Sequence, residues 1–278
     1  MAEYSSLNWT SEDGIDIHGY HGTSANPKAV LAVVHGIGEH AERYKHLGEF
    51  MTEHGYAFAA FDHRGHGLSK GKRGHTPSYK ALSDDVNQFL EKIRAFYPNK
   101  PIFLYGHSMG GNIVLDYYTR HPDANLKGII TTGAFIKLAF EPSAFMVGLG
   151  RFMRNILPGF TQNNQLVLEH ISRSPEVVEA YKNDPLVHNK LTASLGIGMI
   201  ETAKKLFSFK GQTKIPMLIM HGGADKLTSP KGSKQFAKNM KGDVTYKEWP
   251  GLFHEIHNEP EKQEVFDYLL KWIDERVS

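Results

Sequence analysis

The sequence IFLYGHSMGGNIVL, from Ile102 to Leu115, passes from an apolar run into a helical pattern and carries a serine at the junction. Gly106, Ser108 and Gly110 have the spacing G-x-S-x-G. Glycines suit these positions in a very tight strand-to-helix turn, because side chains there would collide with the backbone that holds the serine. The pattern therefore predicts a strand, a sharp turn that exposes the Ser108 hydroxyl, and a helix from Met109.

Apolar runs and polar helical patterns alternate on both sides of this turn. The runs are too short for helices and have no polar face, as expected of strands that are buried on both sides. The expected strands are AVLAVVHG (29–36), YAFAAFD (56–62), IFLYGHS (102–108), LKGIITTG (126–133), KIPMLIMHG (214–222) and VTYKEW (244–249). Helices are expected over residues 42–54, 83–96, from 109 onward, over 229–240 and after Pro260. The alternation predicts an α/β fold with a mainly parallel central sheet and helices on both faces.

A long interval separates the expected strand at residues 126–133 from the next one at 214–222. It holds about 80 residues, whereas a parallel crossover needs only about a dozen. We therefore expect an α/β core formed by residues 1–133 and 210–278, with an inserted helical cap, or lid, over residues 134–209.

Composition narrows the class of protein. The chain has 278 residues, of which 40% are hydrophobic, and it has no cysteine, which excludes disulfides, thiolate metal sites and a cysteine nucleophile. The formal charge of +2 gives no bulk attraction to nucleic acid, so we expect no nucleic-acid partner. The opening MAEYSSLNWTSEDG is polar and acidic, unlike a signal peptide, and no apolar run reaches the roughly 18 residues of a membrane span. We expect a cytoplasmic protein.

Reactive side chains follow three of the expected strands. Ser108 follows IFLYGH, Asp225 lies in HGGADKLTSP after MLIM, and His254 lies in PGLFHEIHNE after VTYKEW. The carboxyl ends of parallel strands meet at one edge of a sheet, and the chain order Ser, Asp, His is the one expected in this architecture. A serine hydroxyl needs an imidazole to take its proton, and the imidazole needs a carboxylate to orient it. The sequence predicts Ser108 as nucleophile, His254 as base and Asp225 as its partner.

This chemistry also requires donors for the oxyanion of the tetrahedral intermediate, which fixed backbone N–H groups supply best. The sequence VVHGIGEH, from Val33 to His40, places a glycine-lined turn after the expected strand at 29–36. We predict that the N–H of Ile37, together with that of Met109, forms the oxyanion hole.

Six motifs together resemble the α/β-hydrolase family, and within it the monoacylglycerol lipase and lysophospholipase-like branch. The motifs are HGIGEH, FDHRGHGLS, GHSMGG, DPLVHN (184–189), HGGAD and the histidine of GLFHEIH. The resemblance covers nearly the whole chain outside the cap. It implies hydrolysis of a single acyl ester of glycerol, a lipid-like small molecule, with no cofactor and no metal.

The resemblance also assigns residues. Ser108, Asp225 and His254 match the catalytic triad of the family, and Ile37 and Met109 match its oxyanion positions. Three further residues match positions that in this branch help to hold the glycerol head group, namely Glu39, Arg43 and His257. Glu39 and Arg43 are four apart at an expected helix start, so an ordinary exposed ion pair is the alternative for them.

Other functions fit parts of the sequence. Gly36-x-Gly38-x-x-Ala41, with Asp62 about 20 residues later, is close to a dinucleotide-binding fingerprint and suggests an NAD-dependent oxidoreductase. That interpretation leaves the expected Ser-Asp-His set unexplained. A general carboxylesterase, a lysophospholipase and a non-catalytic receptor could each use the same pocket. Seven histidines crowd residues 35–75, but they lack metal-ligand spacing and we expect no metal: His35, His40, His46, His54, His63, His66 and His75.

The early cap, FIKLAFEPSAFMVGLGRFMRNILPGF (135–160), has apolar residues mostly at three- and four-residue spacing. One interpretation is simple packing of the cap onto the core. The other is that part of this surface lines an acyl-chain tunnel and part contacts a membrane, where Lys137, Arg151 and Arg154 would meet anionic headgroups beside an apolar face. Flexible methionines suit a pocket for chains of varying shape.

Overall fold

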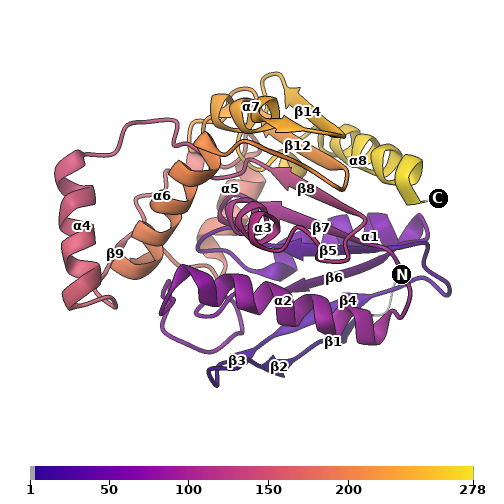
Figure 1. Cartoon of the computed structure of the whole chain (residues 1–278), viewed down its shortest axis with the longest axis horizontal. Coiled ribbons are helices and arrows are strands. Elements are labelled where there is room, and N and C mark those ends of the chain that lie inside the picture. Colours follow the sequence, from indigo (N-terminus) through magenta and orange to yellow (C-terminus); the bar gives the residue numbers. More distant parts are fainter. Residues whose placement is uncertain (1–3, 278) are drawn as a thin grey trace.

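An eight-stranded sheet runs through the centre of the protein (Figure 1). The computed structural model describes residues 4–277. From one edge to the other, the strands are β1 (Tyr4–Ser6), β4 (Gly19–Gly22), β6 (Ala57–Phe61), β5 (Val30–Val34), β7 (Ile102–His107), β8 (Gly128–Thr132), β12 (Met217–Gly222) and β14 (Val244–Trp249). The six strands from β6 to β14 are parallel, while β4 and β1 add antiparallel at one edge. The predicted fold class is confirmed, and all six expected strands are present.

Helices cover both faces of the sheet because side chains alternate along each strand. On one face, Val30 and Ala32 join the apolar cluster formed with α2 (Tyr79–Phe96), α3 (Met109–Arg120) and α7 (Pro230–Asn239). On the other face, Leu31 and Val33 pack in a second cluster with α1 (Lys45–Glu53) and α8 (Lys262–Val277). The parallel strands are therefore buried on both sides, as their continuous apolar runs predict.

The chain between β8 and β12 forms most of the remaining helices. In order, it contains α4 (Ala144–Ile156), β9 (Thr161–Asn163), α5 (Pro175–Asn183), β10 (Lys190–Thr192) and α6 (Ala193–Ser208). Strands β9 and β10 pair antiparallel, and α6 packs into the same apolar cluster as α2 and α3. Helix α4 lies at the outer edge of the molecule (Figure 1) and has no buried residue. The division into a core and a cap at residues 134–209 stays a prediction.

Short elements complete the chain. One antiparallel pair is formed by β2 (Trp9–Thr10) and β3 (Asp16–Ile17), and one parallel pair by β11 (Gly211–Gln212) and β13 (Met240–Lys241). Short 3-10 helices span Ala41–Tyr44, Leu168–His170 and Ile256–Asn258. None of the helices within residues 4–277 has the length and apolar character needed to span a bilayer.

Candidate active site

Ser108 lies at the tip of a sharp turn between β7 and α3, with φ 54° and ψ −115°. The two glycines of the motif make this turn possible. A Cβ on Gly106 would lie 2.5 Å from the carbonyl oxygen of Gly110, and a Cβ on Gly110 would lie 2.1 Å from that of Val34. Any side chain at either position would therefore displace the backbone that presents Ser108, as the spacing predicts.

Asp225 and His254 are in direct contact. The Nδ1 atom of His254 lies 2.7 Å from Oδ2 of Asp225. The carboxylate is fixed in turn, because its Oδ1 accepts the N–H groups of Leu227 and Thr228 at 2.8 and 2.9 Å, and its Oδ2 accepts the hydroxyl of Thr228 at 2.8 Å. With Nδ1 as the donor to Asp225, Nε2 of His254 is left free to accept a proton.

The charges of this pair shift both pKa values. Burial alone would lower the pKa of His254, but the Asp225 carboxylate more than offsets it and the pKa is raised. Burial would raise the pKa of Asp225, yet the His254 charge prevails and holds it well below its usual range. A second imidazole, His221, lies 3.1 Å from Oδ2 of Asp225 and is fully buried. Sequence reasoning missed His221, although its place four residues before Asp225 was a signal.

Ser108 and His254 line one cavity. No hydrogen bond joins their side chains in the described part of the chain, residues 4–277. Such bonds are often long before substrate binds. The structure therefore brings the three predicted residues to one edge of the sheet, with the Asp225–His254 contact formed, and their catalytic roles stay predictions.

The turn after β5 packs directly against the serine. A Cβ on Gly36 would lie 3.2 Å from Cβ of Ser108, and Gly38 has φ 76°. Ile37 lines the same cavity as Ser108, whereas Met109 is the first residue of α3 and is fully buried. The loop is thus where oxyanion donors would have to lie, and the roles of Ile37 and Met109 stay predictions.

The expected head-group residues Glu39 and Arg43 lie behind this loop. The Oε1 atom of Glu39 accepts the N–H of Gly36 at 2.6 Å and the hydroxyl of Tyr44 at 2.7 Å, and its Oε2 accepts from Arg43 at 2.7 Å. The side chains of Glu39 and Arg43 are only 3% and 10% exposed, so the alternative of an ordinary exposed ion pair is wrong. Burial raises the pKa of Glu39.

Arg43 has a second acidic partner, Glu255, which sequence reasoning missed. Two hydrogen bonds of 2.7 and 2.8 Å join the guanidinium to the Glu255 carboxylate. Burial alone would raise the pKa of Glu255, but the charge of Arg43 lowers it to about 2. The guanidinium also stacks on the ring of Tyr181 in α5, 4.5 Å from its centre.

His257, the third expected head-group residue, is 1% exposed. Its ring stacks on that of Tyr44 at 4.8 Å, and within residues 4–277 neither ring nitrogen has a hydrogen-bond partner. None of Glu39, Arg43 and His257 lines the cavity. The structure therefore does not place these three residues in the cavity with Ser108 and His254. Their burial favours the interpretation that they support the loop of Ile37.

The residues of the dinucleotide fingerprint have structural partners. The carboxylate of Asp62 accepts the N–H groups of Ala41 and Leu68, both at 2.7 Å, and Asp62 is 2% exposed. A carboxylate that is already bonded inside the protein is not available to a ribose hydroxyl. The histidines nearby pack ring against ring, with His35 and His63 4.4 Å apart, and no group in residues 4–277 has the arrangement of a metal site.

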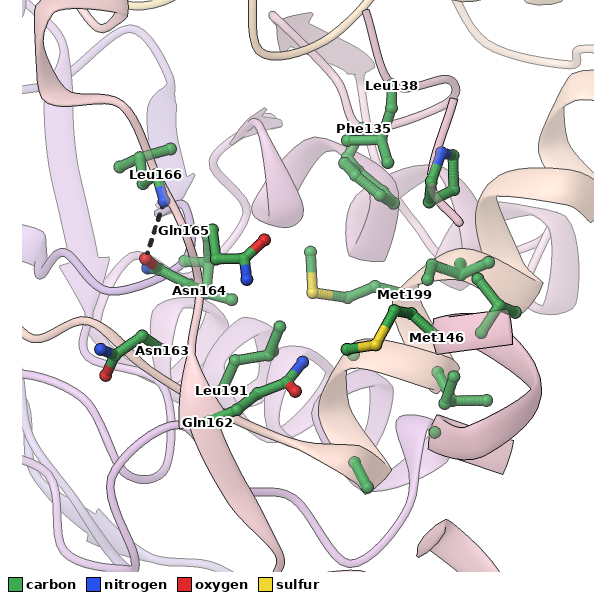
Figure 2. A pocket seen from close by; sticks show the side chains of 18 of the residues that line it. Phe135, Leu138, Met146, Gln162, Asn163, Asn164, Gln165, Leu166, Leu191 and Met199 are labelled. Atoms are coloured by element: carbon green, nitrogen blue, oxygen red, sulfur yellow. Dashed lines mark hydrogen bonds between the residues drawn. The ribbon is translucent and has the colours of Figure 1, made fainter. Parts of the chain in front are cut away.

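The cavity has a volume of about 400 Å³, within the range of small-molecule sites. Figure 2 shows Met146 of α4 and Met199 of α6 on one side, and Gln162 and Gln165 reaching into the same space from the segment around β9. Among the described residues, no lysine or arginine lines this cavity, and its only carboxylate is that of Glu141. The site combines apolar walls with a patch of uncharged amides, which the sequence pattern did not indicate.

Helix α4 presents two apolar faces. Met146, Gly150 and Met153 line the cavity, whereas Phe145 and Phe152 are 76% and 60% exposed. The helix therefore does more than pack onto the core, because its outer aromatic side chains remain in solvent.

The sequence and the fold are similar to those of known proteins. A family profile described as "Serine aminopeptidase, S33" matches residues 25–261. The chain is 36% identical over 253 residues to an uncharacterized abhydrolase domain-containing protein of Dictyostelium discoideum, covering 90% of this chain but only 27% of that protein. It is 34% identical over 250 residues to a monoacylglycerol lipase of Mycolicibacterium smegmatis, covering 89% of each chain.

A solved structure is also similar. The crystal structure of Paleococcus ferrophilus monoacylglycerol lipase matches with a TM-score of 0.79 and 30% identity, covering 98% of both chains. The resemblance read from the motifs is thus matched along nearly the whole chain.

Proposed function

We propose that this chain, which belongs to the serine aminopeptidase S33 family of α/β-hydrolases, cleaves monoacylglycerols to glycerol and free fatty acid. It is a serine hydrolase of the branch that includes monoacylglycerol lipases. Relatives with these names are hydrolases of lipid esters, and the proposal extends that substrate class to this chain. No cofactor takes part.

The lining of the cavity carries this proposal. An acyl chain gains free energy on leaving water for apolar walls, here those of Met146, Met153 and Met199. A glycerol head group has hydroxyls and no charge, which suits the amides of Gln162 and Gln165. A lysophospholipid would bring a phosphate into a cavity that has no lysine or arginine among its described lining residues, so the neutral head group is favoured.

The contact between Asp225 and His254, and the cavity that His254 shares with Ser108, support the following proposed mechanism. Ser108 attacks the ester carbonyl carbon while Nε2 of His254 takes the hydroxyl proton, and Asp225 stabilises the imidazolium. The N–H groups of Ile37 and Met109 hold the oxyanion. When the bond to glycerol breaks, His254 returns the proton to the leaving oxygen. The acyl-enzyme is then hydrolysed by a water molecule that His254 deprotonates.

Residues 134–209 act as the cap in this proposal. The inner face of α4 holds the acyl chain, and its outer face, with Phe145 and Phe152, contacts the membrane from which the substrate comes. Glu39 and Arg43 serve the head group indirectly, by holding the loop of Ile37 in place. His257 supports them through its stacking on Tyr44, whose hydroxyl donates to Glu39.

The test is release of glycerol and fatty acid from monoacylglycerols of short, medium and long chain, beside di- and triacylglycerol and lysophosphatidylcholine. Wild type should act mainly on monoacylglycerols, and Ser108→Ala should lose this activity. Equal turnover of simple esters without glycerol would make the protein a general carboxylesterase. No turnover of any ester would contradict the proposal and favour a receptor.

A further inference from the structure

Positive charge is concentrated in one part of the chain. Residues 202–242 contain nine lysines and a single acidic residue, Asp225, so this segment has a formal charge of +8, against +2 for the whole chain. Asp225 is buried beside His254 and does not offset charge at the surface. The remainder of the chain therefore has a formal charge of −6, so the positive charge of the sequence is gathered in this one segment.

All but one of the lysines of this segment lie in solvent without acidic partners among the described residues. Lys214 pairs with Asp123, but in the described range, 4–277, the other eight form no ion pair. On α7 the exposed residues Lys231, Lys234 and Lys238 share one face, opposite the buried Phe236. Like charges at three- and four-residue spacing repel each other and weaken a helix. A surface that carries this repulsion uncompensated is suited to an external anion.

The end of α6 places three more lysines beside this face. Lys204, Lys205 and Lys210 are exposed at or just after the carboxyl end of α6. That end adjoins α7, because the side chain of Asn239 donates to the carbonyl oxygen of Phe207 at 3.3 Å. Figure 1 shows the end of α6 meeting α7. We call these six residues the lysine surface: Lys204, Lys205, Lys210, Lys231, Lys234 and Lys238.

Exposed aromatic side chains continue the lysine surface toward the cavity. Phe207 is 38% exposed, and the amine of Lys137 lies 5.7 Å from its ring centre. Lys137 begins the segment that leads into α4, where Phe140 and Phe145 are 59% and 76% exposed. Phe140 also lines the cavity. Cationic and apolar groups therefore border each other near the entrance for substrate.

We propose that the lysine surface docks the protein on bilayers that contain anionic phospholipids, and so brings the apolar face of α4 against the lipid. This inference rests on the proposed function, since it names the surface from which the substrate is drawn. Six lysines, five of them on α6 and α7 and one just after α6, form an open face, which matches many phosphates in a plane better than one bound phosphate. Each lysine near such a bilayer adds attraction that salt screens.

Binding to vesicles tests the proposal directly. Vesicles of phosphatidylcholine alone are compared with vesicles that also contain phosphatidylserine, by co-sedimentation at low and high salt. Wild type should bind the anionic vesicles preferentially and release them at high salt. The triple change Lys231→Glu, Lys234→Glu and Lys238→Glu should weaken this binding by at least about 100-fold. Equal binding of both vesicle types, or an unaffected triple variant, would overturn the proposal.

A matched variant controls for net charge. Lys92, Lys182 and Lys271 are exposed lysines on three other helices, and their joint change to Glu alters the total charge equally. This control should bind vesicles almost as well as wild type. If it loses as much affinity as the first triple, net charge and not the lysine surface governs binding. Retention on single-stranded RNA with no retention on vesicles would also contradict the proposal.

Activity separates this inference from the proposed function. On a water-soluble short-chain ester, the lysine variant should match wild type, because its changes lie outside the cavity. On monoacylglycerol dispersed in anionic vesicles, it should be slower. If wild type hydrolyses no monoacylglycerol even in detergent, the proposed function fails while vesicle binding can still be measured. If hydrolysis in detergent is normal but anionic vesicles are not bound, only the docking inference fails.

Discussion

The guanidinium of Arg43 forms two hydrogen bonds, 2.7 and 2.8 Å long, with the carboxylate of Glu255, the residue that follows His254. The same guanidinium bonds Glu39, which accepts the N–H of Gly36 in the loop of the expected oxyanion hole. One buried cation thus joins the loop of the expected oxyanion hole to the loop that carries His254, the expected base.

Removing the charge of Glu255 should destabilise the protein. In Glu255→Gln, Arg43 keeps one acidic partner but loses the other in a buried site, and breaking such a pair costs about 3 kcal/mol or more. Urea unfolding should show this loss of free energy. Glu264→Gln, at an exposed position of α8, should change it by less than about 0.5 kcal/mol. Equal losses of unfolding free energy in the two variants would show that the pair of Arg43 and Glu255 does not stabilise the fold.

The pH dependence of activity should report on His254. Only the neutral imidazole can accept the proton of Ser108, and the Asp225 carboxylate raises the pKa of His254 above its usual value. The value of kcat/KM should therefore fall as the pH drops through a point above about 6.5. If the midpoint of this fall in kcat/KM lies at or below the ordinary pKa of histidine, about 6.5, the assignment of His254 as the base is contradicted.

Asp225→Asn should change both the rate and the pH at which kcat/KM falls. The amide no longer favours the imidazolium, so burial dominates and the acid limb should move to lower pH. The rate at neutral pH should drop by about four orders of magnitude, because the imidazole also loses its correct tautomer. Asp243→Asn, which changes an exposed carboxylate that does not line the cavity, serves as the control and should keep both the rate and the pH dependence.

Ser108 should be conformationally strained. Its φ of 54° lies where residues with a side chain are disfavoured and glycine is not. Ser108→Gly and Ser108→Ala should both be inactive, but the glycine variant should be more stable than the alanine variant by about 1 kcal/mol in urea unfolding. The same pair of changes at Ser208, at the exposed end of α6, should reverse the order, since alanine favours helix there.

Buried histidines should make the fold sensitive to acid. Burial lowers the pKa of His63 to about 4 and that of His107 to about 3. The unfolded chain binds protons at these rings below about pH 6.5 while the folded protein does not, so stability should fall between pH 6.5 and 4, by on the order of 3 kcal/mol per ring. The raised pKa of His254 has the opposite effect on stability. The stability that His254 contributes is present below about pH 6.5 and is lost as the pH rises above that value. Free energies of unfolding measured at pH 7, 6, 5 and 4 check this, and a flat profile would contradict it.

The sequence predicted those parts of the fold that depend on local pattern. Strands such as β7 and β12 are buried on both faces, so their apolar runs were continuous, and the reactive residues followed directly at their carboxyl ends. Strands β1 and β4, of three and four residues, were missed because such short pieces carry no periodicity.

Interactions between distant residues could not be predicted in this way. Arg43 and Glu255 are 212 positions apart, and the i,i+4 spacing pointed only to Glu39. The periodicity of α4 indicated an apolar face but not what covers it, and the structure leaves Phe145 and Phe152 exposed. The amides of residues 162–165 form part of the cavity through folding of the segment between α4 and α5, a feature that no local pattern specifies.

The lining of the cavity is divided unevenly along the chain. Ile37, Ser108, Leu227, Thr228 and His254 contribute from outside the stretch 135–200, and every other lining residue falls within it. The groups proposed to react and the groups proposed to select the substrate thus lie in separate tracts of the chain. Exchange of the one continuous tract between relatives should therefore change which ester is accepted while the proposed reacting residues stay the same.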